Sequence, residues 1–268
     1  VGQRVFVTDV GEGARPLVLL HDVLQSGFAF DRVAQTLALA RRVVVVDLPG
    51  AGESDRPEPE HAEGYAPRWL AARVASTLAE LSLSEVDVLA QGYGATVAFA
   101  LALAQPDLVA KLIAIAPPLS GMHLPHELRL ATLPKVGELA FERAYRRADL
   151  RRTMGTWFSS PELVDELAID VWWDRLGRQG GYAAARAMLL QLAQLGPLAT
   201  AAQGLGTPTL LLWGDRDRVV TTGDCERWRG LLPHAEAVVI EGCGHAVAEE
   251  RPDRVVAEVE RFTGSVHA

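Results

Sequence analysis

Short runs of apolar residues alternate along most of the chain with longer segments in which apolar positions repeat at a helical period. The runs at residues 43–46 and 210–213 contain no polar residue. Strands that are apolar at every position are typical of a parallel sheet whose two faces are covered by helices. The pattern therefore predicts an α/β fold with a doubly wound sheet.

The same alternation predicts individual elements and one interruption. We expect strands at residues 4–8, 16–20, 43–46, 86–90, 111–116, 209–213 and 237–240. We expect helices at residues 27–40, 67–83, 95–105, 221–232 and 252–263. Residues 119–206 instead follow a helical pattern punctuated by proline, without a strand-like run. We therefore expect residues 1–118 and 207–268 to form the core, and residues 119–206 to form a helical lid inserted into it.

Three segments at predicted strand ends carry candidate chemistry, because ligands of open α/β sheets bind outside the carboxyl ends of the strands. Residues 88–95 read VLAQGYGA, where a strand turns sharply into a helix. Residues 212–219 read LWGDRDRV, and residues 241–246 read EGCGHA just before the last helix. These three strand ends are therefore the candidate site.

Together with LLHD at residues 19–22 and DLPGAGESD at residues 47–55, these segments resemble the α/β-hydrolase superfamily, specifically its lidded members. The resemblance covers the core in the chain order nucleophile, acid, histidine that this family uses. It implies a mostly parallel central sheet flanked by helices, with an inserted helical lid. It further implies that Asp217 orients His245 as a base, and that the backbone N–H groups of Val23 and Tyr93 form an oxyanion hole.

The chain departs from the family at the nucleophile. Family members carry Ser, Cys or Asp at the centre of the strand-to-helix elbow, where this chain has Gly92. Two interpretations of Gly92 are open. Glycine relaxes the strained backbone of such a turn, as in a protein without catalysis, or it opens a small space beside His245 through which substrate or water could reach the imidazole. Covalent acyl transfer is excluded at this position.

A second departure is Asp22, which stands where the family often has glycine after a histidine. Two roles are open for its carboxylate: it bonds the backbone at the turn, or it enters the site and repels anions. Asp215 rivals Asp217 as the orienting acid, although the family position matches Asp217. His21 is expected to be a packed structural residue.

Aromatic residues gather in the predicted lid. They either pack the interior of the insert or line an apolar substrate pocket. The candidate pocket residues are Asp22, Gln91, Trp157, Phe158 and Trp172.

An oriented base, an oxyanion hole and a lidded pocket without a nucleophile favour proton abstraction over acyl transfer. His245 would remove a proton beside a carbonyl, and loss of a leaving group such as acetate would complete an elimination. This combination resembles the acetate-eliminating enzymes of tetronate and spirotetronate biosynthesis, an antibiotic-type secondary metabolism, and predicts a lyase acting on an acetylated tetronate. Two alternatives stay open: a hydrolase of an ester or lactone in which His245 activates water, and a non-catalytic protein that binds a small molecule.

The composition limits the kinds of molecule that the protein is expected to bind. The 268 residues include 34 acidic and 26 basic ones, giving a net charge of −8 without a basic run. Nucleic acid and anionic membrane surfaces are therefore disfavoured as partners, and no apolar run is long enough to span a membrane. The two cysteines are far apart in sequence, which favours a cytoplasmic protein without a disulfide. We expect a small, largely apolar substrate and neither cofactor nor metal, since no ligand spacing with acidic residues occurs at His123, His126, His234 and His267.

Overall fold

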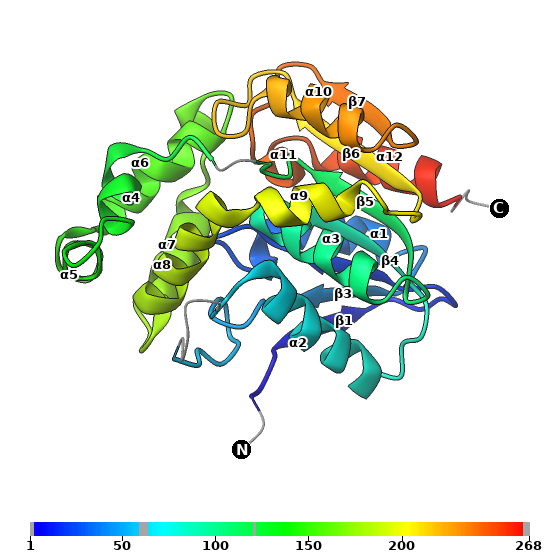
Figure 1. Cartoon of the computed structure of the whole chain (residues 1–268), viewed down its shortest axis with the longest axis horizontal. Coiled ribbons are helices and arrows are strands. Elements are labelled where there is room, and N and C mark those ends of the chain that lie inside the picture. The colour runs from blue at the N-terminus through cyan, green and yellow to red at the C-terminus, as the bar shows by residue number, and fades with distance from the viewer. Residues whose placement is uncertain (1–2, 59–63, 120–121, 265–268) are drawn as a thin grey trace.

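The structure is a computed structural model, and it describes residues 3–58, 64–119 and 122–264. One seven-stranded sheet runs through it (Figure 1). The strands are β1 (Val7–Val10), β2 (Leu17–Leu20), β3 (Val43–Val46), β4 (Val86–Gln91), β5 (Val109–Ile115), β6 (Thr209–Gly214) and β7 (Glu236–Ile240). Their spatial order is β1-β3-β2-β4-β5-β6-β7. Strand β1 pairs antiparallel with β3, and the other neighbouring pairs are parallel.

Strands β2, β3, β4 and β6 are buried at every position. The sequences of β2 and β3 are apolar throughout, as expected for covered parallel strands. Parallel strands need crossover connections, and these supply the covering helices. The core helices are η1 (Gly27–Phe30), α1 (Asp31–Leu37), α2 (Pro67–Glu80), α3 (Tyr93–Ala104), α10 (Thr222–Leu231), α11 (Val247–Glu250) and α12 (Pro252–Thr263). In Figure 1, α2 and α3 lie in front of the sheet, while α1 and α12 lie behind it.

Helix α3 is the central helix of the front layer. It packs against β4, β5, α2 and α9, so most of its positions are buried and its sequence is apolar on nearly every side. This packing holds the N-terminus of α3, and therefore the turn before it, in one place at the carboxyl end of β4.

A run of helices separates β5 from β6. Its members are α4 (His126–Ala131), α5 (Gly137–Ala144), α6 (Arg147–Trp157), η2 (Pro161–Leu163), α7 (Glu166–Leu176), α8 (Gly181–Gln191), η3 (Leu192–Gln194) and α9 (Gly196–Ala202). Helices α4 to α8 extend to one side of the sheet in Figure 1, whereas α9 crosses in front of it. Within described residues 122–206 there is no strand. The role of these helices as a lid stays a prediction.

The elements agree with the sequence pattern except at some ends. The predicted strand at residues 43–46 and the predicted helix at residues 252–263 have the observed bounds. The first strand begins at Val7 rather than residue 4, because the N–H groups of Arg4 and Phe6 bond to side chains of the loop after β3 and not to a strand.

Other differences concern helices. Helix α2 ends at Glu80 rather than residue 83. The helix predicted at residues 27–40 is a 3-10 turn followed by α1, which ends at Leu37. Helix α3 begins at Tyr93 rather than residue 95, directly after Gly92. The short helix α11 was not predicted.

Candidate active site

The turn that joins β4 to α3 has a glycine at its centre. Gly92 has a φ of 53° and a ψ of −121°, a backbone conformation that side chains rarely adopt. A Cβ atom at this position would overlap the carboxyl group of Asp22. A side chain at residue 92 and the observed carboxylate of residue 22 therefore exclude each other.

The Asp22 carboxylate fills the space above Gly92. Its Oδ1 accepts hydrogen bonds from the backbone N–H groups of Val23, at 2.7 Å, and Tyr93, at 2.6 Å. Its Oδ2 lies 3.0 Å from Nε2 of His245. The residue is completely buried. Of the two roles that the sequence left open, Asp22 combines both, because it bonds the turn after β2 and also enters the site.

His245 is held on its other side by Asp217. Its Nδ1 lies 2.7 Å from Oδ2 of Asp217. The second oxygen of Asp217 accepts hydrogen bonds from the N–H groups of Val219, at 2.7 Å, and Val220, at 2.9 Å. These bonds fix the carboxylate after β6, so the imidazole is clamped between Asp217 and Asp22.

The two carboxylates determine the charge of His245. Burial opposes protonation, but the charges of Asp217 and Asp22 and their hydrogen bonds outweigh it and raise the pKa of His245 to about 10. The imidazole is therefore cationic at neutral pH and donates from both ring nitrogens. We call the arrangement Asp22–His245–Asp217 the triad.

This geometry changes two expectations. An open space beside His245 was expected, and that expectation is wrong because the Asp22 carboxylate occupies it. The N–H groups of Val23 and Tyr93 converge on one point, as an oxyanion hole requires. That point is the protein's own Asp22 Oδ1 rather than free space.

Neighbouring titratable residues have other partners. Nδ1 of His21 lies 2.8 Å from the carbonyl oxygen of Asp22, and Nε2 accepts a hydrogen bond of 3.0 Å from the N–H of Leu48. Burial lowers the pKa of His21, so it is a neutral, packed residue that links β2 to the loop after β3. Asp215 accepts a hydrogen bond from the N–H of Cys243 at 3.2 Å, whereas Asp217 is the acid that contacts His245.

The inserted helices reach the triad through Trp157. Its carbonyl oxygen accepts hydrogen bonds from the N–H groups of His245, at 2.6 Å, and Ala246, at 3.0 Å. Its indole ring meets the imidazole edge-on, with 5.2 Å between centroids. Within the described part of the chain, the buried Nε1 atoms of Trp157 and Trp172 and the Nε2 atom of Gln91 have no hydrogen-bond partner.

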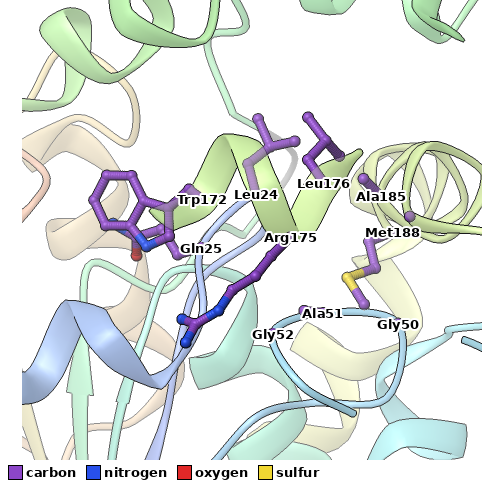
Figure 2. Close-up of a pocket in the computed structure, with 11 residues that line it drawn as sticks. Leu24, Gln25, Gly50, Ala51, Gly52, Trp172, Arg175, Leu176, Ala185 and Met188 are labelled. Carbon is purple, nitrogen blue, oxygen red and sulfur yellow. The ribbon is translucent and has the colours of Figure 1, made fainter. Parts of the chain in front are cut away.

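Two cavities adjoin this region. The larger, of about 230 Å³, lies between the core and the inserted helices, and its walls include Phe28, Phe158, Leu163 and Glu249. The smaller, of about 20 Å³, includes Trp172 and Gln25 (Figure 2). Figure 2 shows that side chains of α7 and α8 face the loop at residues 50–52 across the smaller cavity.

The predicted pocket residues are therefore divided among several places. Phe158 lines the larger cavity and Trp172 the smaller one. Trp157 packs on His245, and Gln91 is buried with its Oε1 3.3 Å from the N–H of Ala248.

Sequence reasoning missed Glu249 and Gln25. Nε2 of Gln25 donates a hydrogen bond of 2.7 Å to Oε2 of Glu249, which links the two cavities. The available signal was the closeness of Glu249 in sequence, since it follows His245 by four residues.

A model of the alpha/beta hydrolase fold family matches residues 15–252. The chain belongs to this family. Its fold class, an α/β-hydrolase fold with a mostly parallel sheet flanked by helices, is thereby confirmed.

The chain is 28% identical to a 2-hydroxy-6-oxononadienedioate/2-hydroxy-6-oxononatrienedioate hydrolase of Cupriavidus pinatubonensis, over 98% of this chain and 91% of that one. It is 26% identical to a soluble epoxide hydrolase of a Corynebacterium species, over 97% of this chain and 94% of that one. The solved structure of the epoxide hydrolase CorEH matches with a TM-score of 0.83 and 25% identity, covering 99% of this chain and 96% of that one.

Other features bear on partners. Among the described residues, which do not include His267, there is no group of three or more His, Cys, Asp or Glu side chains arranged to hold a metal ion. Cys225 and Cys243 are free and buried. No helix in the described ranges is long and apolar enough to cross a membrane.

Proposed function

We propose that the protein is a hydrolase in which the carboxylate of Asp22 takes over the role of the missing elbow nucleophile. The observation that carries this proposal is the environment of that carboxylate. One oxygen lies between two backbone N–H donors, and the other lies against His245, in the space that an elbow side chain would fill. In this proposal the nucleophile lies after β2 instead of after β4. It uses the same two N–H donors and the same histidine.

In the first step, Oδ2 of Asp22 attacks a saturated carbon that bears a leaving group. A carbon–oxygen bond to Asp22 forms, the bond to the leaving group breaks, and the electron pair departs with that group. A carboxylate is suited to this displacement because it is a stable anion that still forms a covalent ester. The resulting ester keeps its carbonyl oxygen, Oδ1, between the N–H groups of Val23 and Tyr93.

Ester formation also changes His245. The charge of Asp22 and its hydrogen bond help to raise the pKa of the imidazole, and alkylation removes both. The pKa of His245 therefore falls when the ester forms, and the ring gives up its proton more readily.

The neutral ring, still oriented by Asp217, then takes a proton from water that attacks Cγ of Asp22. Negative charge develops on Oδ1, where the two N–H donors already converge. Collapse of this intermediate releases the product alcohol and restores the carboxylate.

The elimination of acetate expected from the sequence loses support for the same reasons. It needs a neutral His245 and free oxyanion donors, whereas the imidazole is protonated and both donors are bonded to Asp22. Direct activation of water by His245 meets the same obstacle in the resting protein. Among relatives, the soluble epoxide hydrolase lends support to a substrate attacked at a saturated carbon.

Heavy-oxygen water tests the proposal. The protein, in excess over a panel of neutral terminal epoxides that includes styrene oxide, completes one turnover in labelled water and is digested for peptide mass analysis. We expect the label in the peptide that contains Asp22 and not in the diol, because the first diol takes its new oxygen from Asp22. Label in the diol alone would show direct attack by water and overturn the proposal, as would no conversion of any epoxide. Release of acetate and an alkene from an acetylated tetronate would favour the lyase instead.

A further inference from the structure

Glu249 is a buried carboxyl group that the triad does not use. It belongs to α11, one helical turn after His245, and lines the cavity of about 230 Å³ between the core and the inserted helices. Part of its surface is open. Its Oε2 accepts the hydrogen bond from Gln25, which follows Asp22 in the same loop. Through its hydrogen bond with Gln25, Glu249 therefore joins the wall of this cavity to the loop that carries Asp22.

The surroundings of Glu249 favour its protonated form. Burial is the largest effect, and together with the charge of Asp22 it raises the pKa of Glu249 to about 8, against the opposing effects of Gln25, His245 and Arg32. At neutral pH the group is mostly a carboxylic acid, which has an O–H to donate. A neutral acid and a carboxylate nucleophile are the two groups that acid-assisted displacement needs.

The cavity favours a neutral, apolar ligand. Phe28 and η1 of the core form one side, and Phe158, Leu163 and Ala168 of the inserted segment contribute apolar surface opposite. The charged groups that face Glu249 or share its cavity are mostly acidic and come from each neighbouring element: Asp22, Asp31, Arg32, Asp165 and His245. This balance disfavours anionic ligands.

We propose that this cavity holds the substrate, and that the Glu249 carboxyl group donates a hydrogen bond and then a proton to the leaving oxygen as Asp22 attacks the adjacent carbon. The inference deepens the proposed function and rests on it. It assigns the substrate class as a neutral epoxide or other strained cyclic ether with an apolar substituent, because only an oxygen leaving group needs this proton.

The protons balance without an outside acid. As the bond from Oδ2 of Asp22 to carbon forms, the carbon–oxygen bond of the ring breaks and its electron pair goes to the oxygen, which takes the proton of Glu249. Glu249 becomes a carboxylate. The proton that His245 releases when Asp22 loses its charge returns Glu249 to its acid form, and His245 is then the base for water.

Glu249→Gln tests the inference, because the amide keeps the size and a hydrogen-bond donor but cannot give up a proton. The rate of ester formation on Asp22 is measured by mass analysis with two neutral probes of similar shape, styrene oxide and phenethyl bromide. With styrene oxide we expect Glu249→Gln to be at least about 100-fold slower than the wild-type protein. With phenethyl bromide, whose bromide leaves without a proton, we expect equal rates.

The pH profile separates acid catalysis from a structural effect. For the wild-type protein, kcat/KM for styrene oxide should fall above about pH 8, where Glu249 ionises, and E249Q should lack this fall. Glu226→Gln, an exposed carboxyl change on α10, is the matched control and should behave as wild type. Equal rates of wild type and E249Q with styrene oxide would overturn the inference about Glu249 alone. Failure of the wild-type protein to form the Asp22 ester with either probe would overturn the proposed function.

Discussion

Residues 22 and 92 are coupled by steric exclusion. The carboxylate at residue 22 fits because residue 92 has no side chain. Its charge is then stabilised by donors that the fold provides in any case, the N–H groups of Val23 and Tyr93. The carboxylate at residue 22 therefore depends on the glycine at residue 92.

Exchanging the two residues tests this coupling. We expect Asp22→Asn to lower kcat by more than about 1,000-fold, because an amide oxygen is a poor nucleophile. The double variant Asp22→Gly with Gly92→Asp returns a carboxylate to the elbow, and we expect it to recover part of the lost activity. Steady-state hydrolysis of styrene oxide measures both effects.

The single variant Gly92→Asp is the control for the exchange. Its new side chain overlaps Asp22 at a backbone conformation that favours glycine, so we expect it to lower the free energy of unfolding by about 1–3 kcal/mol. Thermal denaturation measures this loss. If the double variant is no more active than Asp22→Gly alone, position 92 cannot accept the nucleophile and the coupling is only steric.

The orienting acid gives a second prediction at this scale. We expect Asp217→Asn to lower kcat by about 10,000-fold, because an amide favours the wrong tautomer of His245. The pKa of His245, followed by the NMR signal of its ring, should fall at the same time. Asp215→Asn is the matched control, since Asp215 bonds the backbone of Cys243 and not the imidazole. An equal loss of kcat in both variants would indicate that Asp215 and Asp217 only stabilise the loop after β6.

At the scale of elements, the sequence predicted the strands well where burial is complete. Runs such as residues 43–46 are apolar at every position, and only a covered parallel strand buries them all. The approach of Asp217 to His245 agrees with what the family resemblance implied, and strand ends on one edge of the sheet bring the two residues together.

The position of the Asp22 carboxylate did not follow from the sequence. Its partners Tyr93 and His245 lie 71 and 223 residues away, and its direction depends on where the packed elements bring them. Glu249 was missed because α11 has four residues, too few to show a helical period.

Another contact between elements joins the inserted helices to the loop that carries His245. The carboxylate of Glu250 accepts hydrogen bonds from the N–H of Ser159, at 2.9 Å, and the N–H of Gly244, at 3.1 Å, and it also bonds the hydroxyl of Ser159. The end of α6 is therefore fixed to the histidine loop independently of the contacts of Trp157.

Loss of this contact should loosen the site. We expect Glu250→Ala to lower the free energy of unfolding by about 1–3 kcal/mol, because it leaves buried donors without a partner. Hydrogen exchange should increase at residues 157–160 and 243–246, and kcat should fall. Ser160→Ala, which removes a hydroxyl bonded only to nearby Glu162 on the surface, should change neither. If exchange rises equally in both variants, the Glu250 contact does not hold the insert.

At the scale of the whole molecule, the charge of the site and that of the chain have the same sign. The net charge is −8, and the triad places two acidic side chains around one imidazolium. Long-range attraction therefore does not favour an anionic substrate. A neutral substrate avoids this repulsion, which agrees with the apolar walls of the larger cavity.

The triad also links the stability of the fold to pH. The pKa of His245 rises from an ordinary 6.5 to about 10 in the folded protein. A raised pKa means that the folded state binds the proton more tightly, so the stabilisation is fully present below pH 6.5 and is lost as the pH rises toward 10. Glu249, raised from 4.5 to about 8, acts in the same direction over a lower range. We therefore expect the melting temperature to fall steadily between pH 6.5 and 10.

Two variants show which residues cause this fall in melting temperature. In E249Q the part of the decline below about pH 8 should be weaker, because an amide does not ionise. In Asp22→Asn the decline should weaken at higher pH, because the imidazole loses one of its two anionic partners and with it part of its affinity for the proton. A wild-type melting temperature that stays constant from pH 6.5 to 10 would contradict a charged triad, and a histidine that is neutral at rest would then be available as a base without prior alkylation of Asp22.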